Sequence, residues 1–152
     1  VKTTAKYWVY SLTGSTIDYW GPIGTAQTIK LANNLLSCGY GALISEAYAM
    51  AKKAGADLDI FCEALPQTAA NSWPLRNVFV AKAFKGDFTP YFRLSAALKD
   101  YKLVIAMADA LGTPSRAAHV VLEYYEAAAQ AGHGELDFGA LALVNNPELR
   151  NE

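Results

Sequence analysis

Apolar residues recur at helical spacing along most of the chain, from Thr25 onward. In the first long stretch, the apolar positions that fall three, four or seven residues apart are Ile29, Ala32, Leu36, Leu43, Ala47 and Met50. Gly55 follows this stretch and suits the C-terminal cap of a helix. The spacing therefore predicts one long helix that begins near Thr25 and ends before Gly55.

The same period continues in five shorter segments. The pattern predicts helices over 57–65, 72–84, 91–112, 113–132 and 135–144. Side chains that cap helix N-termini stand near four of their starts: Asp57, Ser72, Thr113 and Asp137. Pro74 and Pro114 suit the first turn of a helix, and Gly112 suits the end of one. The chain is thus predicted to be all-α, a multi-helix bundle around a long central helix.

Residues 1–20 follow a different pattern. An apolar helical piece leads to a turn at Gly14, and the segment 15–20 then has the composition of a short strand. Because a lone strand is not stable without a sheet, we interpret 1–20 as the end of a further α/β domain and 21–152 as a helical domain. The first residue is Val1, which favours a processed or cut product. The alternative is a terminus that simply packs on the helices.

Composition narrows the function classes. The chain has 152 residues, of which 53% are hydrophobic and 18% charged, and a net charge of -1, which fits one domain with a real core. It contains no basic block for nucleic acid and no apolar run of about 18 residues for a membrane span. Two cysteines, Cys38 and Cys62, fit a reduced, cytoplasmic protein, and the distant His119 and His133 argue against a metal site.

A first polar stripe lies on the long helix. With Lys30 at zero, Asn34 falls about 40° away, Ser37 about 20° the other way and Asn33 about 60° away, so all four share one face. A lysine that is partly buried beside two amides loses hydration, which is how lysines become acid–base catalysts. The alternative is a side chain that extends to solvent. The pattern leaves both interpretations open.

A second polar stripe lies in the segment 91–112. Phe92, Ser95 and Lys99 fall on one helical face, whereas Asp100 points about 100° away from Lys99 among apolar neighbours. A carboxylate in such surroundings needs a partner. The alternative is a surface lysine and an aspartate paired with a neighbouring Lys or Arg. The two stripes could face each other across a cleft, but periodicity does not show that they do.

Other residues carry weaker signals. Glu46 lies about 160° from Lys30 around the helix, so we expect it to be structural or paired elsewhere. His119 stands among Ala and Val and is predicted to be a core histidine rather than a ligand. No G-x-G-x-x-G follows a strand, so the chain carries no dinucleotide fingerprint of its own.

Four motifs in order then resemble the landmarks of one family. They are GPIGTAQTIKLANN, LISEAYAMAKKAGAD, GDFTPYFRLSAALKDYKLVIAMADALGTPS and AGHGELDFGAL. They resemble the C-terminal helical domain of the β-hydroxyacid dehydrogenases, typified by 3-hydroxyisobutyrate dehydrogenase and related in fold to the C-terminal domain of 6-phosphogluconate dehydrogenase. The resemblance covers about 15–141 and implies that 1–20 is the end of an N-terminal Rossmann domain.

The resemblance implies roles for individual residues. Lys30 matches the family's general acid/base and Asn34 the amide that holds the substrate oxygen. Contacts with substrate or with NAD or NADP are implied at Gly21, Gly24, Phe92, Lys99 and Asp100. The cofactor would be bound mainly by the N-terminal domain, so the isolated chain is expected to bind it poorly and to turn over little substrate.

This sequence departs from the family pattern at a few positions. Ala26 replaces the second glycine of the G-x-G, and Gly139 stands where a serine is common. The phosphogluconate enzymes carry His and Glu where this chain has Asn33 and Ser37, which argues against a phosphogluconate substrate.

The leading hypothesis is therefore the C-terminal domain of an NAD(P)-dependent oxidoreductase that interconverts a small β-hydroxyacid and its aldehyde or keto form, assembled as a homodimer or homotetramer. A sibling reductase of a small aldehyde acid, such as succinic semialdehyde or glyoxylate, shares this mechanism. The alternative from another class is a non-catalytic helical association module.

Overall fold

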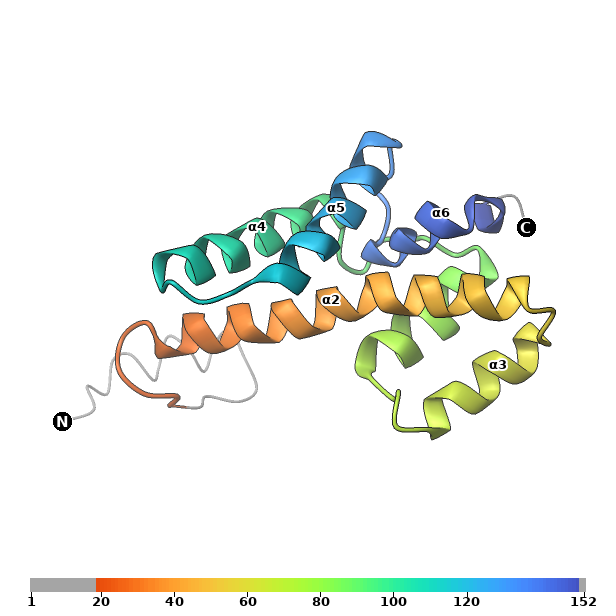
Figure 1. Cartoon of the computed structure of the whole chain (residues 1–152), viewed down its shortest axis with the longest axis horizontal. Coiled ribbons are helices and arrows are strands. Elements are labelled where there is room, and N and C mark those ends of the chain that lie inside the picture. Colours follow the sequence, from red (N-terminus) through yellow and green to blue (C-terminus); the bar gives the residue numbers. More distant parts are fainter. Residues whose placement is uncertain (1–18, 151–152) are drawn as a thin grey trace, which may run out of the picture. The chain divides into compact units, whose positions relative to one another are not determined.

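The computed structural model describes residues 19–150, and most of them are helical (Figure 1). The helices are α2 (Thr25–Lys53), α3 (Leu58–Ala64), α4 (Leu94–Ala110), α5 (Arg116–Gln130) and α6 (Ala142–Asn145). Shorter turns are η1 (Leu65–Gln67), η2 (Leu75–Val80), η3 (Ala83–Lys85), η4 (Phe138–Leu141) and η5 (Pro147–Arg150). Over 19–150 the chain forms no β-sheet, and the predicted all-α class is confirmed.

The chain divides into two compact units, 1–30 and 31–152, and the division falls within α2. In the first unit the predicted helical piece and most of the predicted strand lie outside the described residues. Tyr19 and Trp20, the last two residues of that strand, are exposed and belong to no regular element. The domain boundary predicted after residue 20 stays a prediction.

The described part of the first unit is a glycine-containing turn that leads into α2. Gly21 and Gly24 have φ angles of 115° and 97°, in the region that side chains rarely adopt. The amide of Thr25 donates to the carbonyl of Pro22 at 3.1 Å, and the hydroxyl of Thr28 donates to the carbonyl of Gly24 at 3.2 Å. Glycine is therefore required by backbone conformation at both positions before the helix.

In the second unit, α4 and α5 lie on one side of α2, and α3 lies on the other (Figure 1). The buried rings of Tyr101 and Tyr125 stack with centroids 5.6 Å apart and join α4 to α5. The hydroxyl of Tyr125 donates to the carbonyl of Cys38 at 3.1 Å, which ties α5 to α2. Near the far end of α2, Tyr48 stacks on Phe84 at 3.9 Å and meets Phe61 of α3 edge-on at 6.0 Å.

Several predicted helix ends are confirmed. α2 ends at Lys53, and Gly55 follows with a φ of 75°. The carboxylate of Asp57 caps α3 by accepting from the amides of Asp59 and Ile60 at 2.9 and 3.1 Å. Asp137 likewise caps η4 by accepting from the amide of Gly139 at 3.0 Å.

Three predicted elements differ from the structure. The segment predicted as one helix over 72–84 contains a π-helix, η2, and a separate turn, η3. Helix α4 begins at Leu94 rather than Tyr91, because the amides of Tyr91 and Phe92 donate to Asp137 and the extended Arg93 forms a bridge with the same residue.

The third difference is at the start of α5. The predicted cap Thr113 instead ends α4, where its amide and hydroxyl both donate to the carbonyl of Ala108, at 3.0 and 3.2 Å. The preceding Gly112 turns the chain there with a φ of 64°. α5 then begins after Ser115, so Pro114 is not in its first turn.

Candidate functional site

A residue of the first polar stripe, on α2, contacts the buried aspartate of the second segment, on α4. The amide nitrogen Nδ2 of Asn34 donates to Oδ2 of Asp100 at 3.1 Å, although the two residues are 66 positions apart. Oδ1 of Asn34 lies 3.5 Å from Nδ2 of Asn33. The structure thus brings together an amide of the first stripe and the carboxylate that lies beside the second, and the hypothesis that the two stripes face each other across a cleft stays a prediction.

Asp100 is a buried carboxylate, only 7% exposed, in a helix face made of apolar residues. Its Oδ1 lies 3.4 Å from Nζ of Lys99, whose side chain is 71% exposed. The predicted need of Asp100 for a partner is therefore met by Asn34 and by the neighbouring lysine, and Lys99 lies at the solvent edge of the pair.

Lys30, the predicted general acid/base, is the last residue of the first unit. It lies four residues before Asn34 along α2, and it is exposed. This exposure agrees with the solvent-facing interpretation of its stripe, and the catalytic role of Lys30 stays a prediction. The same is true of ligand contacts at Gly21 and Gly24.

Phe92 is positioned by Asp137, a residue that the sequence analysis treated only as a helix cap. Oδ2 of Asp137 accepts from the amides of Tyr91 and Phe92 at 2.8 and 3.0 Å, and the carbonyl of Phe92 accepts from the amide of Phe138 at 2.9 Å. Phe92 lines an open hollow of about 380 Å³ with Pro90, Tyr91, Arg93 and Ala96. The only signal for this role was the place of Asp137 in the AGHGELDFGAL motif.

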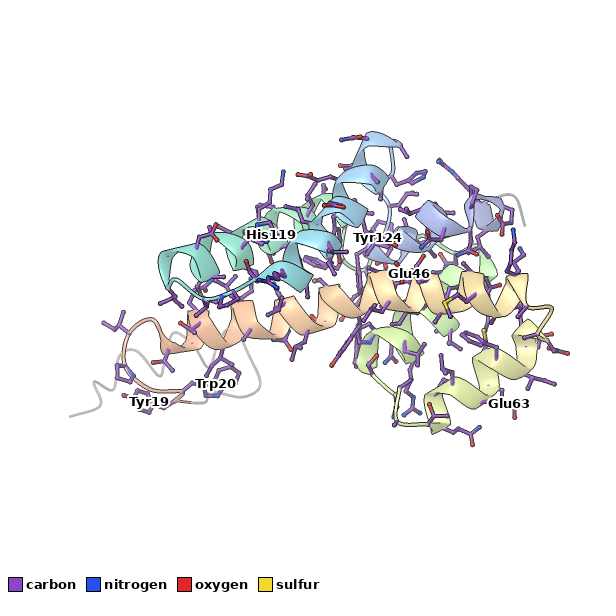
Figure 2. The ribbon with its side chains drawn as sticks, viewed as in Figure 1. Tyr19, Trp20, Glu46, Glu63, His119 and Tyr124 are labelled. Carbon is purple, nitrogen blue, oxygen red and sulfur yellow. The ribbon has the colours of Figure 1, made fainter. Side chains whose placement is uncertain are left out.

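The structure agrees with the expectation for Glu46 and contradicts the one for His119. Glu46 accepts a hydrogen bond from the hydroxyl of Tyr124 where α2 meets α5, as expected for a structural residue paired elsewhere (Figure 2). This hydrogen bond, then burial and the charge of Glu46, raise the pKa of Tyr124. The prediction of a core histidine at 119 is wrong. His119 is exposed, and its Nδ1 lies 3.2 Å from Oγ of Ser115 one turn earlier.

The departure at Gly139 has a packing explanation. A Cβ at this position would lie 2.9 Å from Cγ1 of Val78 and 3.1 Å from Cβ of Ala83. Both neighbours are buried and short, so neither can easily move away. A serine there would need a different arrangement of η2 and η3.

Two further properties concern the described residues as a whole. Within 19–150, no three His, Cys, Asp or Glu side chains are grouped as metal ligands. Across the same residues, no helix combines the length and the apolar character that a membrane span requires.

Comparison with curated proteins and solved structures shows what the chain is similar to. It is 33% identical over 121 residues to L-threonate dehydrogenase of Escherichia coli K12, which covers 80% of this chain and 40% of that protein. It is 28% identical over 128 residues to 3-sulfolactaldehyde reductase of the same strain, over 84% of this chain and 43% of that protein. The chain thus spans about two fifths of these curated relatives.

Solved structures agree with this similarity. A crystal structure of 3-hydroxyisobutyrate dehydrogenase from Salmonella typhimurium matches with a TM-score of 0.75 and 32% identity, over 80% of this chain and 42% of that one. A 3-hydroxyisobutyrate dehydrogenase structure from Mycobacterium tuberculosis has a TM-score of 0.84 over 96% of this chain and 53% of that one. Its identity of 22% supports the fold alone.

A family model matches most of the chain. Residues 24–144 match the model described as NAD-binding of NADP-dependent 3-hydroxyisobutyrate dehydrogenase. That description agrees with the expected nicotinamide cofactor, NAD or NADP. The matched range includes the Asn34–Asp100 contact and ends within α6. The chain therefore belongs to the β-hydroxyacid dehydrogenase family, in the part that this model describes.

Proposed function

We propose that this chain forms the helical, substrate-binding part of an NAD(P)-dependent dehydrogenase or reductase that interconverts a small β-hydroxyacid and its aldehyde or keto form. The observation that carries the proposal is the Asn34–Asp100 hydrogen bond, in a chain that belongs to the β-hydroxyacid dehydrogenases. A polar pair at a helix–helix contact, with one partner half-exposed, suits a binding site better than a packed core.

In the proposed mechanism, Lys30 exchanges the proton of the substrate hydroxyl. During oxidation the neutral amine of Lys30 accepts this proton, and during reduction the ammonium form returns it to the new alkoxide oxygen. The amide of Asn34 holds that same oxygen by hydrogen bonding. NAD or NADP supplies the hydride acceptor or donor when it is bound. Lys99, whose side chain is exposed beside Asp100, adds a positive charge that favours an anionic substrate or cofactor.

The hollow beside Phe92 supports a place for the cofactor. Tyr91, Phe92 and Arg93 are among the residues that line it, and Nε of Arg93 is 3.3 Å from Oε2 of Glu135. Aromatic faces suit a planar ring, and a guanidinium suits phosphate groups. These residues fit a dinucleotide, with Phe92 as the proposed contact.

The names of the relatives narrow the substrate class. L-threonate, 3-hydroxyisobutyrate and 3-sulfolactaldehyde are all small molecules that carry an acidic group. We therefore propose a small anionic hydroxyacid as the substrate. Because one relative is named as a reductase of an aldehyde, reduction of a small aldehyde acid is the second candidate.

We extend the proposal to the organisation of the protein. Residues 1–20 would close an N-terminal Rossmann domain, and 21–152 would form the substrate and oligomerisation domain of a cytoplasmic homodimer or homotetramer. The support is that the relatives are about twice as long as this chain, whose matched residues cover 40% to 43% of them. Exposed apolar side chains on α2, such as Leu36 and Leu43, are available for association.

The test is substitution of Lys30 in the protein at its full encoded length. Oxidation of a panel of small hydroxyacids is followed by the absorbance of reduced NAD and NADP. Lys30→Ala should lower kcat by about 10²- to 10⁴-fold, the range for a lost general acid or base, with an unchanged melting temperature. Lys53→Ala is the matched control, because Lys53 is an exposed lysine on the same helix.

Two results would contradict the proposal. Turnover of Lys30→Ala at the wild-type rate would remove the lysine from the chemistry. No turnover of any hydroxyacid or aldehyde by the wild-type protein, together with a defined oligomer, would favour the non-catalytic association module. In that case the oligomeric state, measured by light scattering, would be the property that substitutions on α2 change.

A further inference from the structure

We propose that Asp100 is a positioning residue, which orients the amide of Asn34 and does not itself bind the substrate. This inference rests on the proposed function, in which Asn34 holds the substrate oxygen. It revises the role expected for Asp100 from the family resemblance. The argument comes from the geometry, the burial and the hydrogen-bonding chemistry of the pair.

The chemistry of the two side chains fixes the direction of the amide. An ionised carboxylate only accepts hydrogen bonds, so it must face the NH₂ end of Asn34 rather than the oxygen end. The structure has this arrangement, with Nδ2 of Asn34 3.1 Å from Oδ2 of Asp100. If the amide flipped, Oδ1 would point at a buried negative charge, and the lost hydrogen bond would become a repulsion. Asp100 therefore selects one of the two amide orientations.

Burial leaves Asp100 little surface with which to touch a substrate. The residue is 7% exposed, and both of its oxygens have polar neighbours: Asn34 at Oδ2 and Lys99 at Oδ1. Asn34, in contrast, is only half-buried. The amide, and not the carboxylate, is therefore the part of the pair that a small molecule can reach.

The part of α4 that carries Asp100 is packed against its neighbours, as a positioning group requires. The next residue, Tyr101, is 1% exposed and stacks on Tyr125, and Tyr125 donates to the backbone of α2 at Cys38. The Cα of Gly39 packs against this region so closely that a Cβ there would lie 3.3 Å from the hydroxyl oxygen of Tyr101. These contacts fix α4 against α2 just beyond the Asn34–Asp100 pair.

The consequence is a defined pattern of hydrogen-bonding groups at Asn34. With one N–H committed to Asp100, the amide presents its oxygen and its second N–H in fixed directions. The oxygen can accept from a substrate hydroxyl, and the N–H can donate to a carbonyl oxygen. A flipped or freely rotating amide would lose this match in a fraction of the molecules.

A set of kinetic variants separates positioning from direct binding. In the full-length protein, Asp100→Ala should lower kcat/KM by about 10- to 100-fold, the cost of a lost hydrogen bond to a charged group. Asp100→Asn can present either its oxygen or its NH₂ group to Asn34 and no longer selects one amide orientation, so its kcat/KM should fall between those of the wild type and Asp100→Ala. In an Asn34→Ala background, Asp100→Ala should have less than about a twofold further effect, because its target is gone.

The same set contains the results that overturn the inference. If Asp100→Asn keeps the wild-type kcat/KM, an acceptor-only carboxylate is not what orients Asn34. If the losses of Asn34→Ala and Asp100→Ala multiply, the two residues act independently. Asp109→Asn is the matched control, since Asp109 is an exposed aspartate on the same helix. Should Asp100→Ala fail to fold, Asp100→Ser replaces it, with a polar side chain too short to reach Asn34.

A spectroscopic measurement tests the geometry without any activity. In ¹⁵N-labelled protein, the side-chain amide of Asn34 should show one proton protected from exchange, and Asp100→Ala or Asp100→Ser should remove this protection. If protection is unchanged, the inference fails even where the enzyme is active. If protection is lost but the wild type turns over nothing, the proposed function fails while the orienting contact stands.

Discussion

Two segments of α2 differ in how far their polar side chains are exposed to solvent. Over 31–37, Asn33 is exposed, while Asn34 and Ser37 are half-buried. Over 38–48, Ser45 is completely buried and the charge of Glu46 is paired with Tyr124 (Figure 2). One helix thus carries an open polar segment followed by a closed one.

In the closed segment, buried polar groups form a hydrogen-bond network with the C-terminal part of the chain. The hydroxyl of Ser45 donates to the carbonyl of Leu141 at 3.2 Å and accepts from Nδ2 of Asn145 at 3.1 Å. The amide of Asn146 donates to the carbonyl of Ser45 at 3.4 Å and to that of Ala142 at 3.2 Å. Through these contacts the C-terminal elements η4 and α6 are fixed to the middle of α2.

The difference shows which polar residues serve the fold and which remain for a ligand. Buried polar groups are stable only when they are fully hydrogen-bonded, and Ser45 meets that condition. Asn34 has a fixed partner in Asp100 and keeps surface that a small molecule can reach. Substitutions in the closed segment should therefore reduce stability, and those in the open segment should mainly change binding or turnover.

The largest stability effect is expected at Gly41, in the closed segment. A Cβ there would lie 2.9 Å from Cδ1 of Leu141 and 3.3 Å from Cζ of Phe79, both fully buried. Gly41→Val should lower the free energy of unfolding by about 2–3 kcal/mol, because the packed core must shift to admit the side chain. Ala32→Val, at an exposed position of the open segment, should change it by less than about 0.5 kcal/mol.

Urea denaturation of the two variants measures this contrast. Equal midpoints for Gly41→Val and Ala32→Val would mean that the core around Leu141 and Phe79 accommodates the extra atoms. The distinction between a closed and an open segment would then not extend to packing.

A smaller loss is expected at Ser45. Ser45→Ala leaves the buried carbonyl of Leu141 and the amide of Asn145 each without one hydrogen bond, which should cost about 1–2 kcal/mol of unfolding free energy. Ser37→Ala is the control, a serine of the open segment that is half-buried. Equal shifts of the melting temperature for the two serine variants would contradict the distinction between the closed and the open segment.

The sequence predicted the closed segment only in part. Local spacing predicts the helix, the glycine that follows it and the pairing of Glu46 away from the face that carries Lys30. Which groups satisfy Ser45 does not, because Asn145 lies 100 residues further along the chain. For the same reason the non-helical segment 91–93 was predicted to be helical: the amides of Tyr91 and Phe92 donate to Asp137, which lies 46 and 45 residues away.

The candidate site was predictable as residue types on helical faces. Periodicity placed Asn34 and Ser37 on one stripe and indicated that Asp100 needs a partner. It could not identify the partner, because that depends on how α4 packs against α2. The stack of Tyr101 on Tyr125 and the hydrogen bond from Tyr125 to Cys38 contribute to that packing, and they join residues far apart in sequence. His119 shows the opposite error, where apolar neighbours in sequence suggested burial and the residue is exposed.

The smallest effect, and the one that depends on pH, is expected at Tyr124. Tyr124→Phe removes the hydrogen bond to Glu46 at the half-buried end of the network and should cost about 0.5–1 kcal/mol at neutral pH. The hydrogen bond to Glu46, followed by burial and by the charge of Glu46, raises the pKa of Tyr124 above its usual value of 10.0. The stabilisation is therefore fully present below about pH 10 and is lost as the pH rises through the higher folded-state pKa.

The measurement is the difference in unfolding free energy between the wild type and Tyr124→Phe at several pH values up to 11. Burial also raises the pKa of Tyr101, to about 12, but it does so in both proteins. The difference between the two proteins therefore cancels the contribution of Tyr101 and leaves that of Tyr124. It should be largest near neutral pH and shrink as the tyrosinate forms beside the carboxylate of Glu46, since two like charges then replace a hydrogen bond. A difference that stays constant above pH 10 would mean that Glu46 is paired elsewhere in solution, and the closed segment would then end before Glu46.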